Sequence, residues 1–206
     1  MYLKTLLQKS YFVLSSPDIN GLPLDKGIEV ALIGRSNAGK SSALNALTQQ
    51  KKLAKISKTP GRTQLINVFQ VTDSIKLIDL PGYGFAKVPL KIKEKWQVTI
   101  NNYLIKRKCL NGIVVLMDIR LPLRDMDVAM LKWAADCELN ILVLLTKCDK
   151  LKRGATQNTK FAVMKSVREI SDKIKVVVFS SHKHIGVDEA ISVLTGWFGL
   201  NNDSTD

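Results

Sequence analysis

Residues 28–48, IEVALIGRSNAGKSSALNALT, join an apolar run, a glycine-rich turn and a segment rich in Ala and Leu. The turn GRSNAGKSS (34–42) has the pattern G-x4-G-K-S of a phosphate-binding loop. Such a loop follows a strand and opens a helix, and both flanks agree with that context. Gly34 and Gly39 let the backbone bend so that successive N–H groups point at phosphate oxygens. We therefore expect a strand, a phosphate loop and a helix in succession.

The side chains of this loop indicate how a nucleotide would be held. Lys40 is expected to reach the β- and γ-phosphates, Ser41 to offer its hydroxyl to Mg²⁺, and Ser42 to contact the α-phosphate. The helix that follows adds the positive end of its dipole. The loop alone does not choose between ATP and GTP, or between a kinase and a switch. The other loop residues expected to contact the nucleotide are Arg35, Ser36, Asn37 and Ala38.

Six short runs are predicted to be buried strands, because they are β-branched and almost continuously apolar. Apolar residues recur at helical spacing between them, which favours a mostly parallel sheet with helices on both sides. The second and third runs are separated only by a short turn around Asp73-Ser74, too short for a crossover, so they should form an antiparallel hairpin. The fold class is therefore α/β, with three layers and a six-stranded mixed sheet that has one reversed strand. The predicted strands are 28–33, 66–72, 75–80, 112–118, 140–145 and 175–179. The helical sets are Trp96, Ile100, Tyr103 and Leu104; Val163, Val167, Ile170 and Ile174; and Val187, Ile191, Leu194 and Phe198.

The third strand ends in Asp79-Leu80-Pro81-Gly82. An Asp at a strand end beside the phosphate loop is the expected carboxylate that holds Mg²⁺ through water. The backbone N–H of Gly82 can approach the γ-phosphate. We expect this segment to complete the phosphate end of the site.

The fifth strand ends in Thr146-Lys147-Cys148-Asp149, and the sixth in Phe179-Ser180-Ser181. The Asp149 carboxylate can accept hydrogen bonds from N1–H and the N2 amino group of guanine, whereas adenine lacks both donors. The Lys147 stem can cover the face of the base, and backbone N–H groups at 179–181 could reach guanine O6. All these motifs lie at carboxyl ends of strands, where ligands bind in open α/β sheets. GTP and GDP are therefore the expected ligands.

A basic segment, SKTPGRTQL (57–65), lies between the phosphate loop and the Asp79 motif. A switch loop must place one Thr hydroxyl on Mg²⁺ only when the γ-phosphate is present. Thr59 and Thr63 are the candidates.

The chain has 206 residues and a net charge of +13, which favours a polyanionic partner. No apolar run approaches the roughly 18 residues that cross a bilayer, and no signal peptide is recognised. Three cysteines without metal spacing indicate reduced thiols. Binding through the basic clusters should weaken steeply with salt. The clusters are Lys51, Lys52, Lys55, Lys58 and Arg62; Lys87, Lys91, Lys93 and Lys95; Lys106, Arg107 and Lys108; and Lys150, Lys152 and Arg153.

Together, GRSNAGKSS, TPGRTQ, DLPGYGFAKV, TKCDK and DIRLPLRDMD (118–127) resemble the EngB (YihA/YsxC) GTPases, of the TrmE–Era-like branch of translation-factor-related GTPases. The resemblance covers about residues 10–198. It implies a Ras-like G domain, which we expect at 26–198. Residues 1–25 precede the first predicted strand and are expected to form an extension packed on or next to this domain, and the polar residues 199–206 are expected to form a flexible tail. The resemblance also implies a cytoplasmic role in assembly of the bacterial large (50S) ribosomal subunit, through rRNA, with effects on cell division and septation.

The resemblance places further contacts in the basic segment, with Thr63 rather than Thr59 on Mg²⁺. Thr146 stands where most GTPases carry Asn, which is usual in this family. The implied nucleotide contacts in the segment are Gly61, Arg62, Thr63, Gln64 and Leu65.

Tyr83 stands where Ras-type enzymes carry the Gln that orients the attacking water, and a phenol cannot do the work of that amide. We expect slow hydrolysis that needs help from a partner or from K⁺, which related TrmE-like GTPases coordinate at the position of Asn37. Arg62 acting as an arginine finger is a weaker option. The residues expected to take part in catalysis are Lys40, Asn37, Thr63 and Gly82.

Two other classes of function stay open. One is a division or signalling GTPase that acts through protein partners. The other is a nucleotide kinase, which would need an acceptor site and a lid that the sequence does not show. For the favoured interpretation we expect a monomer that contacts rRNA, with no DNA partner and no membrane insertion.

Overall fold

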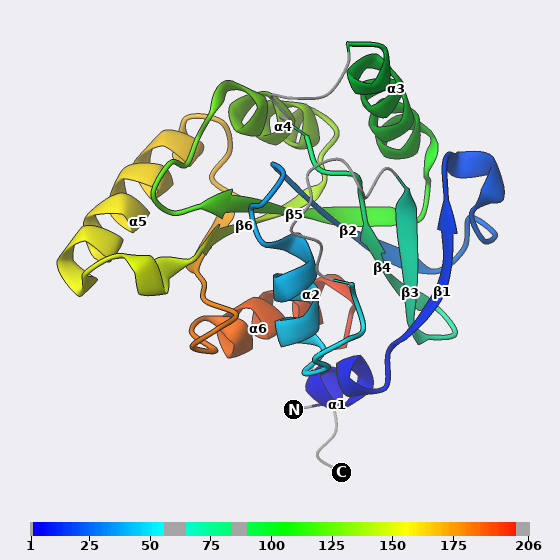
Figure 1. The fold of residues 1–206 in the computed structure, drawn as a ribbon, viewed down its shortest axis with the longest axis horizontal. Coiled ribbons are helices and arrows are strands. Elements are labelled where there is room, and N and C mark those ends of the chain that lie inside the picture. The colour runs from blue at the N-terminus through cyan, green and yellow to red at the C-terminus, as the bar shows by residue number, and fades with distance from the viewer. Residues whose placement is uncertain (1, 56–64, 84–89, 201–206) are drawn as a thin grey trace.

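The computed structural model describes residues 2–55, 65–83 and 90–200, and for 90–97 it describes the backbone alone. Figure 1 shows a central sheet with helices on both sides. Among the described residues, no helix combines the length and the apolar character that a membrane span requires. The elements are α1 (Tyr2–Gln8), β1 (Tyr11–Ser16), η1 (Ile19–Gly21), β2 (Ile28–Gly34), α2 (Lys40–Leu47), β3 (Ile66–Thr72), β4 (Ile75–Asp79), α3 (Leu90–Lys106), β5 (Leu110–Asp118), α4 (Asp125–Asp136), β6 (Asn140–Thr146), η2 (Cys148–Lys150), α5 (Arg153–Arg168), β7 (Lys175–Val178) and α6 (Val187–Trp197).

The sheet has the strand order β1-β3-β4-β2-β5-β6-β7. β3 pairs antiparallel with both neighbours, and the other pairs are parallel, so β3 is the single reversed strand among those described. This confirms the α/β class, the hairpin and the reversed strand. The predicted count of six strands is wrong by one, because Tyr11–Ser16 adds an edge strand beside β3.

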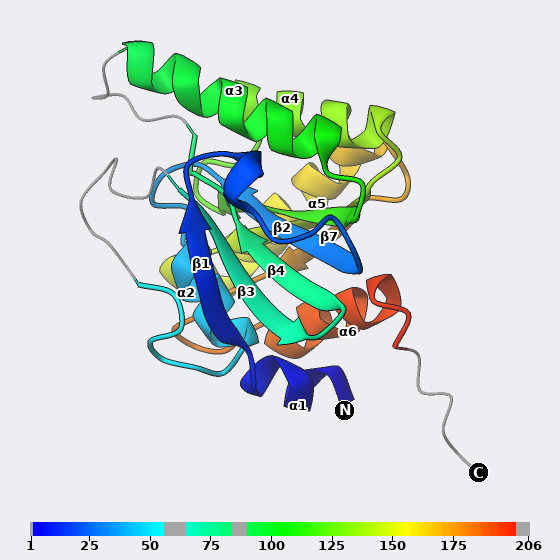
Figure 2. The ribbon, with the colours of Figure 1, turned by 90° about the vertical axis from the view of Figure 1, so that its right-hand side faces the viewer.

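The alternation of side chains along the central strands divides the core in two. Val30 and Leu32 of β2 face α1, α2 and α6, whereas Ala31 and Ile33 face α3, α4 and α5. Figure 2 shows these two groups of helices on opposite sides of the sheet. Both faces are apolar, and each fully buried Leu or Ile stabilises the fold by about 1.5–3 kcal/mol.

Two details of the helices differ from the sequence pattern. Helices α1 and α4 were not predicted from the sequence. In addition, α5 ends at Arg168, so Ile170 and Ile174 pack from the turn that follows and do not extend the helix. Apolar spacing continued past the helix end because both side chains still pack against the same core.

A buried ionic network joins α3 to the amino-terminal end of β2. The Glu29 carboxylate is fully buried and accepts hydrogen bonds from the Tyr103 hydroxyl at 2.9 Å and from Arg107 Nε and Nη2 at 2.9 and 2.7 Å. Lys76 Nζ lies 3.9 Å from Glu29 Oε1. A buried charge is tolerated only when it is paired in this way. The network therefore fixes α3 at the end of the sheet that lies opposite the phosphate loop.

Asp25 extends this network to the segment before β2. Its carboxylate accepts the backbone N–H groups of Lys108 at 3.0 Å and Cys109 at 2.8 Å, and lies 3.8 Å from Arg107 Nε. Desolvation acts to raise the pKa of Asp25, but hydrogen bonds from the Cys109 thiol and the two N–H groups outweigh it and lower the pKa to about 2. The connection from α3 to β5 is thus tied to the start of β2.

Candidate functional site

The predicted motifs meet at the carboxyl ends of the strands. Gly34 ends β2, Asp79 ends β4, Thr146 ends β6, and Phe179 directly follows β7. Hydrogen bonds join the motifs to one another; for example, the Thr146 hydroxyl donates to Ala38 O at 2.7 Å, and Cys148 N–H donates to Phe179 O at 3.2 Å. The structure therefore assembles one site from segments that are far apart in the sequence, at the place where open α/β sheets bind ligands.

The phosphate loop needs its two glycines for different reasons. A Cβ on Gly34 would come 2.5 Å from Leu116 O of the neighbouring strand, so only glycine fits. Gly39 has φ 96° and precedes the first residue of α2, Lys40. Asn37, at φ 63°, is also left-handed. These turns place the loop over the N-terminus of α2, which favours an anion.

Lys40 and Asp79 face each other at the phosphate end. Lys40 Nζ lies 3.9 Å from Asp79 Oδ1, and Asp79 is only 3% exposed. Burial raises the pKa of Asp79, and Lys40 and a hydrogen bond from Asn67 oppose that rise. Asp79 Oδ2 accepts from Asn67 Nδ2 at 3.4 Å, whereas Oδ1 is buried without a hydrogen-bond partner among the described residues. An orphaned carboxylate oxygen beside a lysine is a fitting acceptor for a water bound to Mg²⁺.

Asn67 was not predicted as a site residue. It lies directly opposite Asp79 in the β3–β4 ladder, and its Oδ1 accepts the Ser15 hydroxyl of β1 at 2.6 Å. The hairpin register was the signal that could have found Asn67, because residues across a ladder are neighbours. Ser15 could not have been found without knowing that β1 joins the sheet.

The segment after Asp79 lies against the phosphate loop. Tyr83 N–H donates to Gly34 O at 3.2 Å, and Ser36 N–H donates to Tyr83 O at 2.9 Å. A Cβ on Gly82 would be 3.2 Å from Lys40 Nζ, so Gly82 packs closely on the lysine. Leu80 and Pro81 link the strand to this contact. Gly82 therefore lies beside the lysine that is predicted to bind the β- and γ-phosphates.

The Tyr83 side chain turns to helix α4. Its hydroxyl donates to Asp127 Oδ1 at 2.6 Å, and the residues are 5% and 1% exposed. Burial and then the neighbouring Asp127 charge raise the pKa of Tyr83 far above its usual range. The phenol is therefore neutral and already engaged. Asp127 stands in the DIRLPLRDMD run but was not predicted to contact the site.

The base end of the site is organised by hydroxyl groups. Asp149 Oδ1 accepts from the Ser180 hydroxyl at 2.7 Å. This hydrogen bond holds the pKa of Asp149 below its ordinary value against the effect of desolvation, so the group is a carboxylate at neutral pH. Thr146, 3% exposed, has its Oγ1 within 3.1 Å of Met117 O as well as 2.7 Å from Ala38 O. A threonine thus ties the base motif to the phosphate loop. Ser181 follows Ser180, and the Cys148 side chain is buried.

Lys147 is stretched between two anchors. It is left-handed at φ 60°, and its Nζ donates to Asn37 O at 2.7 Å and lies 3.0 Å from Asp118 Oδ2. Asp118 also binds Arg120 Nη2 at 2.6 Å. The Arg120 hydrogen bonds hold the pKa of Asp118 well below its usual range despite partial desolvation. The apolar stem of Lys147 is thereby fixed where it can cover a purine.

One part of the predicted site lies outside the described residues. Leu65 is described and is 38% exposed. The remaining predicted residues, Thr59, Gly61, Arg62, Thr63 and Gln64, fall in 56–64, so the assignment of Thr63 to Mg²⁺ stays a prediction.

The comparisons with known proteins agree with this geometry. A family profile described as "50S ribosome-binding GTPase" matches residues 29–147. The chain is 57% identical over 194 residues to the "Probable GTP-binding protein EngB" of Colwellia psychrerythraea, covering 94% of this chain and 87% of the relative. It is 57% identical over 192 residues to the protein of the same name from Idiomarina loihiensis, covering 93% of each.

Solved structures show the same fold. A crystal structure of a probable GTP-binding protein engB superposes with a TM-score of 0.68 at 21% identity, covering 84% of this chain and all of that one. A point variant of Aquifex aeolicus Era bound to GDP.AlF4- superposes with a TM-score of 0.66 at 21% identity, covering 84% of this chain and 57% of that one. The fold is thus the Ras-like P-loop GTPase fold, and with relatives at 57% identity over nearly its whole length the chain belongs to the EngB family of GTP-binding proteins.

Proposed function

We propose that this protein is a GTP-hydrolysing switch that assists assembly of the large (50S) ribosomal subunit in the bacterial cytoplasm, and that normal division and septation depend on it. The nucleotide part of the proposal is carried by the hydrogen bond from Ser180 to Asp149. This bond fixes the Asp149 carboxylate in the part of the site that is predicted to bind the base. Guanine supplies two donors that such a carboxylate can accept. The ribosomal part is supported by family membership and by the charge of the chain.

Mg²⁺ is proposed as the cofactor. It would be held by the Ser41 hydroxyl in the first turn of α2, by Thr63, and through water by Asp79, whose Oδ1 has no hydrogen-bond partner among the described residues. When bound, Mg²⁺ would neutralise charge that develops on the β- and γ-phosphates. Lys40 would bind the same phosphates.

Slow hydrolysis is proposed because Tyr83 has no amide group to position water, and its hydroxyl already donates a hydrogen bond to Asp127. K⁺ is proposed to assist near Asn37, at the left-handed turn of the phosphate loop. The measurement is GTP turnover at saturating Mg²⁺ in KCl against NaCl. Equal turnover in the two salts would remove K⁺ from the mechanism.

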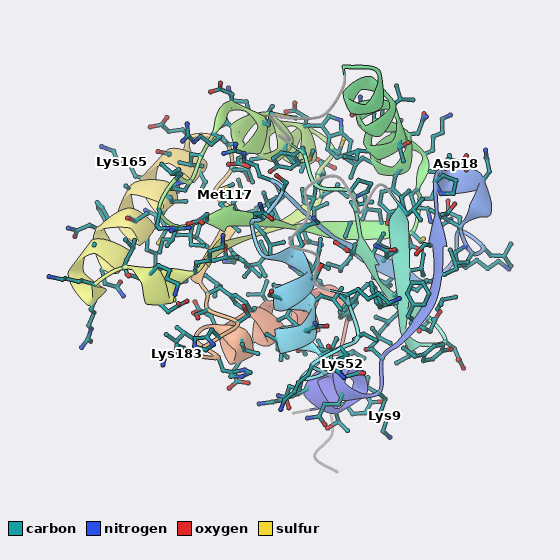
Figure 3. The ribbon with its side chains drawn as sticks, viewed as in Figure 1. Lys9, Asp18, Lys52, Met117, Lys165 and Lys183 are labelled. Atoms are coloured by element: carbon teal, nitrogen blue, oxygen red, sulfur yellow. The ribbon has the colours of Figure 1, made fainter. Side chains whose placement is uncertain are left out.

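The rRNA contact is proposed to use lysines beside the nucleotide site. Lys51, Lys52 and Lys55 are exposed directly before the basic segment, and Lys150 and Lys152 are exposed beside the base motif. Arg107 does not belong to this set, because it is paired with Glu29. Figure 3 shows Lys52 near α1 and other lysines, Lys165 and Lys183, near α5 and α6, so positive charge also lies elsewhere on the surface.

The test is co-sedimentation of the protein with purified large ribosomal subunits at several salt concentrations, with GDP and with a non-hydrolysable GTP analogue. We expect binding with the GTP analogue, weaker binding with GDP, and a steep loss as salt rises. Lys40→Ala should bind little nucleotide and should not respond to the analogue. No binding in the analogue state would contradict the proposal and favour a GTPase that acts through protein partners.

A charge-matched pair of variants locates the contact. Replacing Lys51, Lys52 and Lys55 with Gln should weaken subunit binding and flatten its salt dependence. Replacing Lys165, Lys173 and Lys175 with Gln removes the same charge near the C-terminal end of α5 and should leave binding close to that of the wild type. Equal loss in both variants would mean that the charge acts without a defined surface.

A further inference from the structure

The buried hydrogen bond between Tyr83 and Asp127 joins two parts of the protein that the sequence keeps 44 residues apart. Tyr83 immediately follows Gly82, which packs on Lys40. Asp127 is in the first turn of α4. The bond is 2.6 Å long and shielded from water at both ends, so it is stronger than a surface contact between the same groups.

Asp127 uses its second oxygen to hold its own helix. Its Oδ2 accepts the Arg124 N–H at 3.0 Å, which satisfies a backbone donor at the start of α4. The side chain is therefore fixed by α4 on one side and presents Oδ1 to the Tyr83 hydroxyl on the other. A rotation of Asp127 that released Tyr83 would also break the helix cap.

The backbone of Tyr83 is fixed just as firmly to the phosphate loop. Its N–H and O pair with Gly34 O and Ser36 N–H, and so continue the ladder between β4 and β2 past the end of the strands. Gly82 is held between this ladder and Lys40. Any movement of the Gly82 N–H relative to the γ-phosphate must therefore carry Tyr83 with it.

From this arrangement we infer that Tyr83 and Asp127 are positioning residues for γ-phosphate recognition. Their hydrogen bond holds the backbone at Gly82 and Tyr83 in place before GTP arrives, which lowers the ordering cost of binding GTP but not that of binding GDP. The inference rests on the proposed function as a GTP switch. It assigns to Tyr83 a role in selecting the nucleotide state, in place of the role in orienting water that its position would have in Ras-type enzymes.

The test is the ratio of the dissociation constants for a non-hydrolysable GTP analogue and for GDP, measured on full-length wild type and on Tyr83→Phe. Loss of a buried hydrogen bond of this kind should weaken binding of the analogue about fivefold, and binding of GDP should change by less than about twofold. Asp127→Ala should shift the ratio in the same direction, and the double variant should shift it no further than the larger single change, because the two groups act as one unit.

Tyr103→Phe is the matched control. It removes a buried tyrosine hydroxyl from a buried carboxylate, Glu29, at 2.9 Å, but at the opposite end of the sheet. It should lower stability to a similar degree and leave the ratio unchanged. A ratio that shifts equally in Tyr103→Phe and Tyr83→Phe, or in neither, would overturn the inference while leaving GTP binding intact. Wild type that binds neither nucleotide would overturn the proposed function and the inference together.

Discussion

The orientation of Asp149 depends on the hydroxyl of Ser180, which is 1% exposed and fixed in turn by the Lys183 N–H at 3.1 Å. One carboxylate oxygen is thus committed to the protein. The carboxylate as a whole is held rigidly in its charged form. A base that offers two adjacent donors is favoured over one that offers none, because adenine would leave the carboxylate without the hydrogen bonds that guanine supplies.

Asp149→Asn should change the preference of the site from guanine nucleotides to xanthine nucleotides. The amide presents a donor where the carboxylate had an acceptor, so we expect GDP affinity to fall by about two orders of magnitude and XDP affinity to rise. The measurement is competition of GDP and XDP against a fluorescent nucleotide. Asp149→Ala is the control: it should lose GDP without gaining XDP, and an equal gain in both variants would contradict the assigned role.

The motifs could be recognised in the sequence because the chemistry of phosphate and guanine restricts which residues can stand there, and the structure brings their described residues together. The residues that were missed act through contacts across the fold. Asn67 reaches Asp79 across a ladder, and Asp118 reaches Lys147 from a neighbouring strand. A single chain gives no local pattern for such pairs, since each depends on strand order and register.

Among the elements, β1 shows why a strand can be missed. Its residues YFVLSS are short and only partly buried, with Tyr11 60% and Phe12 49% exposed. Only pairing with β3 makes the segment a strand, and local propensity does not show that pairing. The central strands were predictable to within about two residues because burial on both faces demands continuous apolar runs.

The free energy of unfolding should depend on pH through Asp25, which ties the segment before β2 to the connection between α3 and β5. Because its pKa is lowered to about 2, the Asp25 carboxylate stabilises the fold above its unfolded pKa of 3.8, and this contribution disappears as pH falls from there through 2. Since the residue is partly exposed, we expect Asp25→Asn to cost about 1 kcal/mol at pH 7. The gap from wild type should shrink below about pH 4.

The measurement is urea unfolding of wild type and Asp25→Asn at pH 7, 5, 4 and 3. Asp73→Asn, in the exposed turn between β3 and β4, is the control for removing one surface charge. A gap between wild type and Asp25→Asn that stays constant down to pH 3 would show that the carboxylate does not act as described.

At the scale of the whole molecule, the predicted nucleotide site draws on the carboxyl ends of β2, β4 and β6 and on the segment after β7, so a bound nucleotide would link segments from across the sheet. A ligand that binds only the folded state raises the free energy of unfolding of the whole domain. At a hundred times its dissociation constant the gain is about 2.7 kcal/mol.

GDP should therefore raise the thermal unfolding midpoint by roughly 5–10 °C for a domain of this size. ADP at the same concentration should produce no shift, because Asp149 has no partner on adenine. Thermal unfolding followed by circular dichroism with each nucleotide is the measurement. Equal stabilisation by ADP would point to binding through phosphates alone.

The order of the strands in the sheet differs from their order in the chain, so β1 must wait for its partner during synthesis. β1 is synthesised early, but its partner β3 comes much later: Ser15 and Asn67 are 52 residues apart. Until the hairpin of β3 and β4 leaves the ribosome, the backbone of β1 has no strand to pair with. The nascent chain therefore carries β1 as an unpaired strand until β3 has been synthesised. A fragment that ends before residue 66 should depend on chaperones to stay in solution.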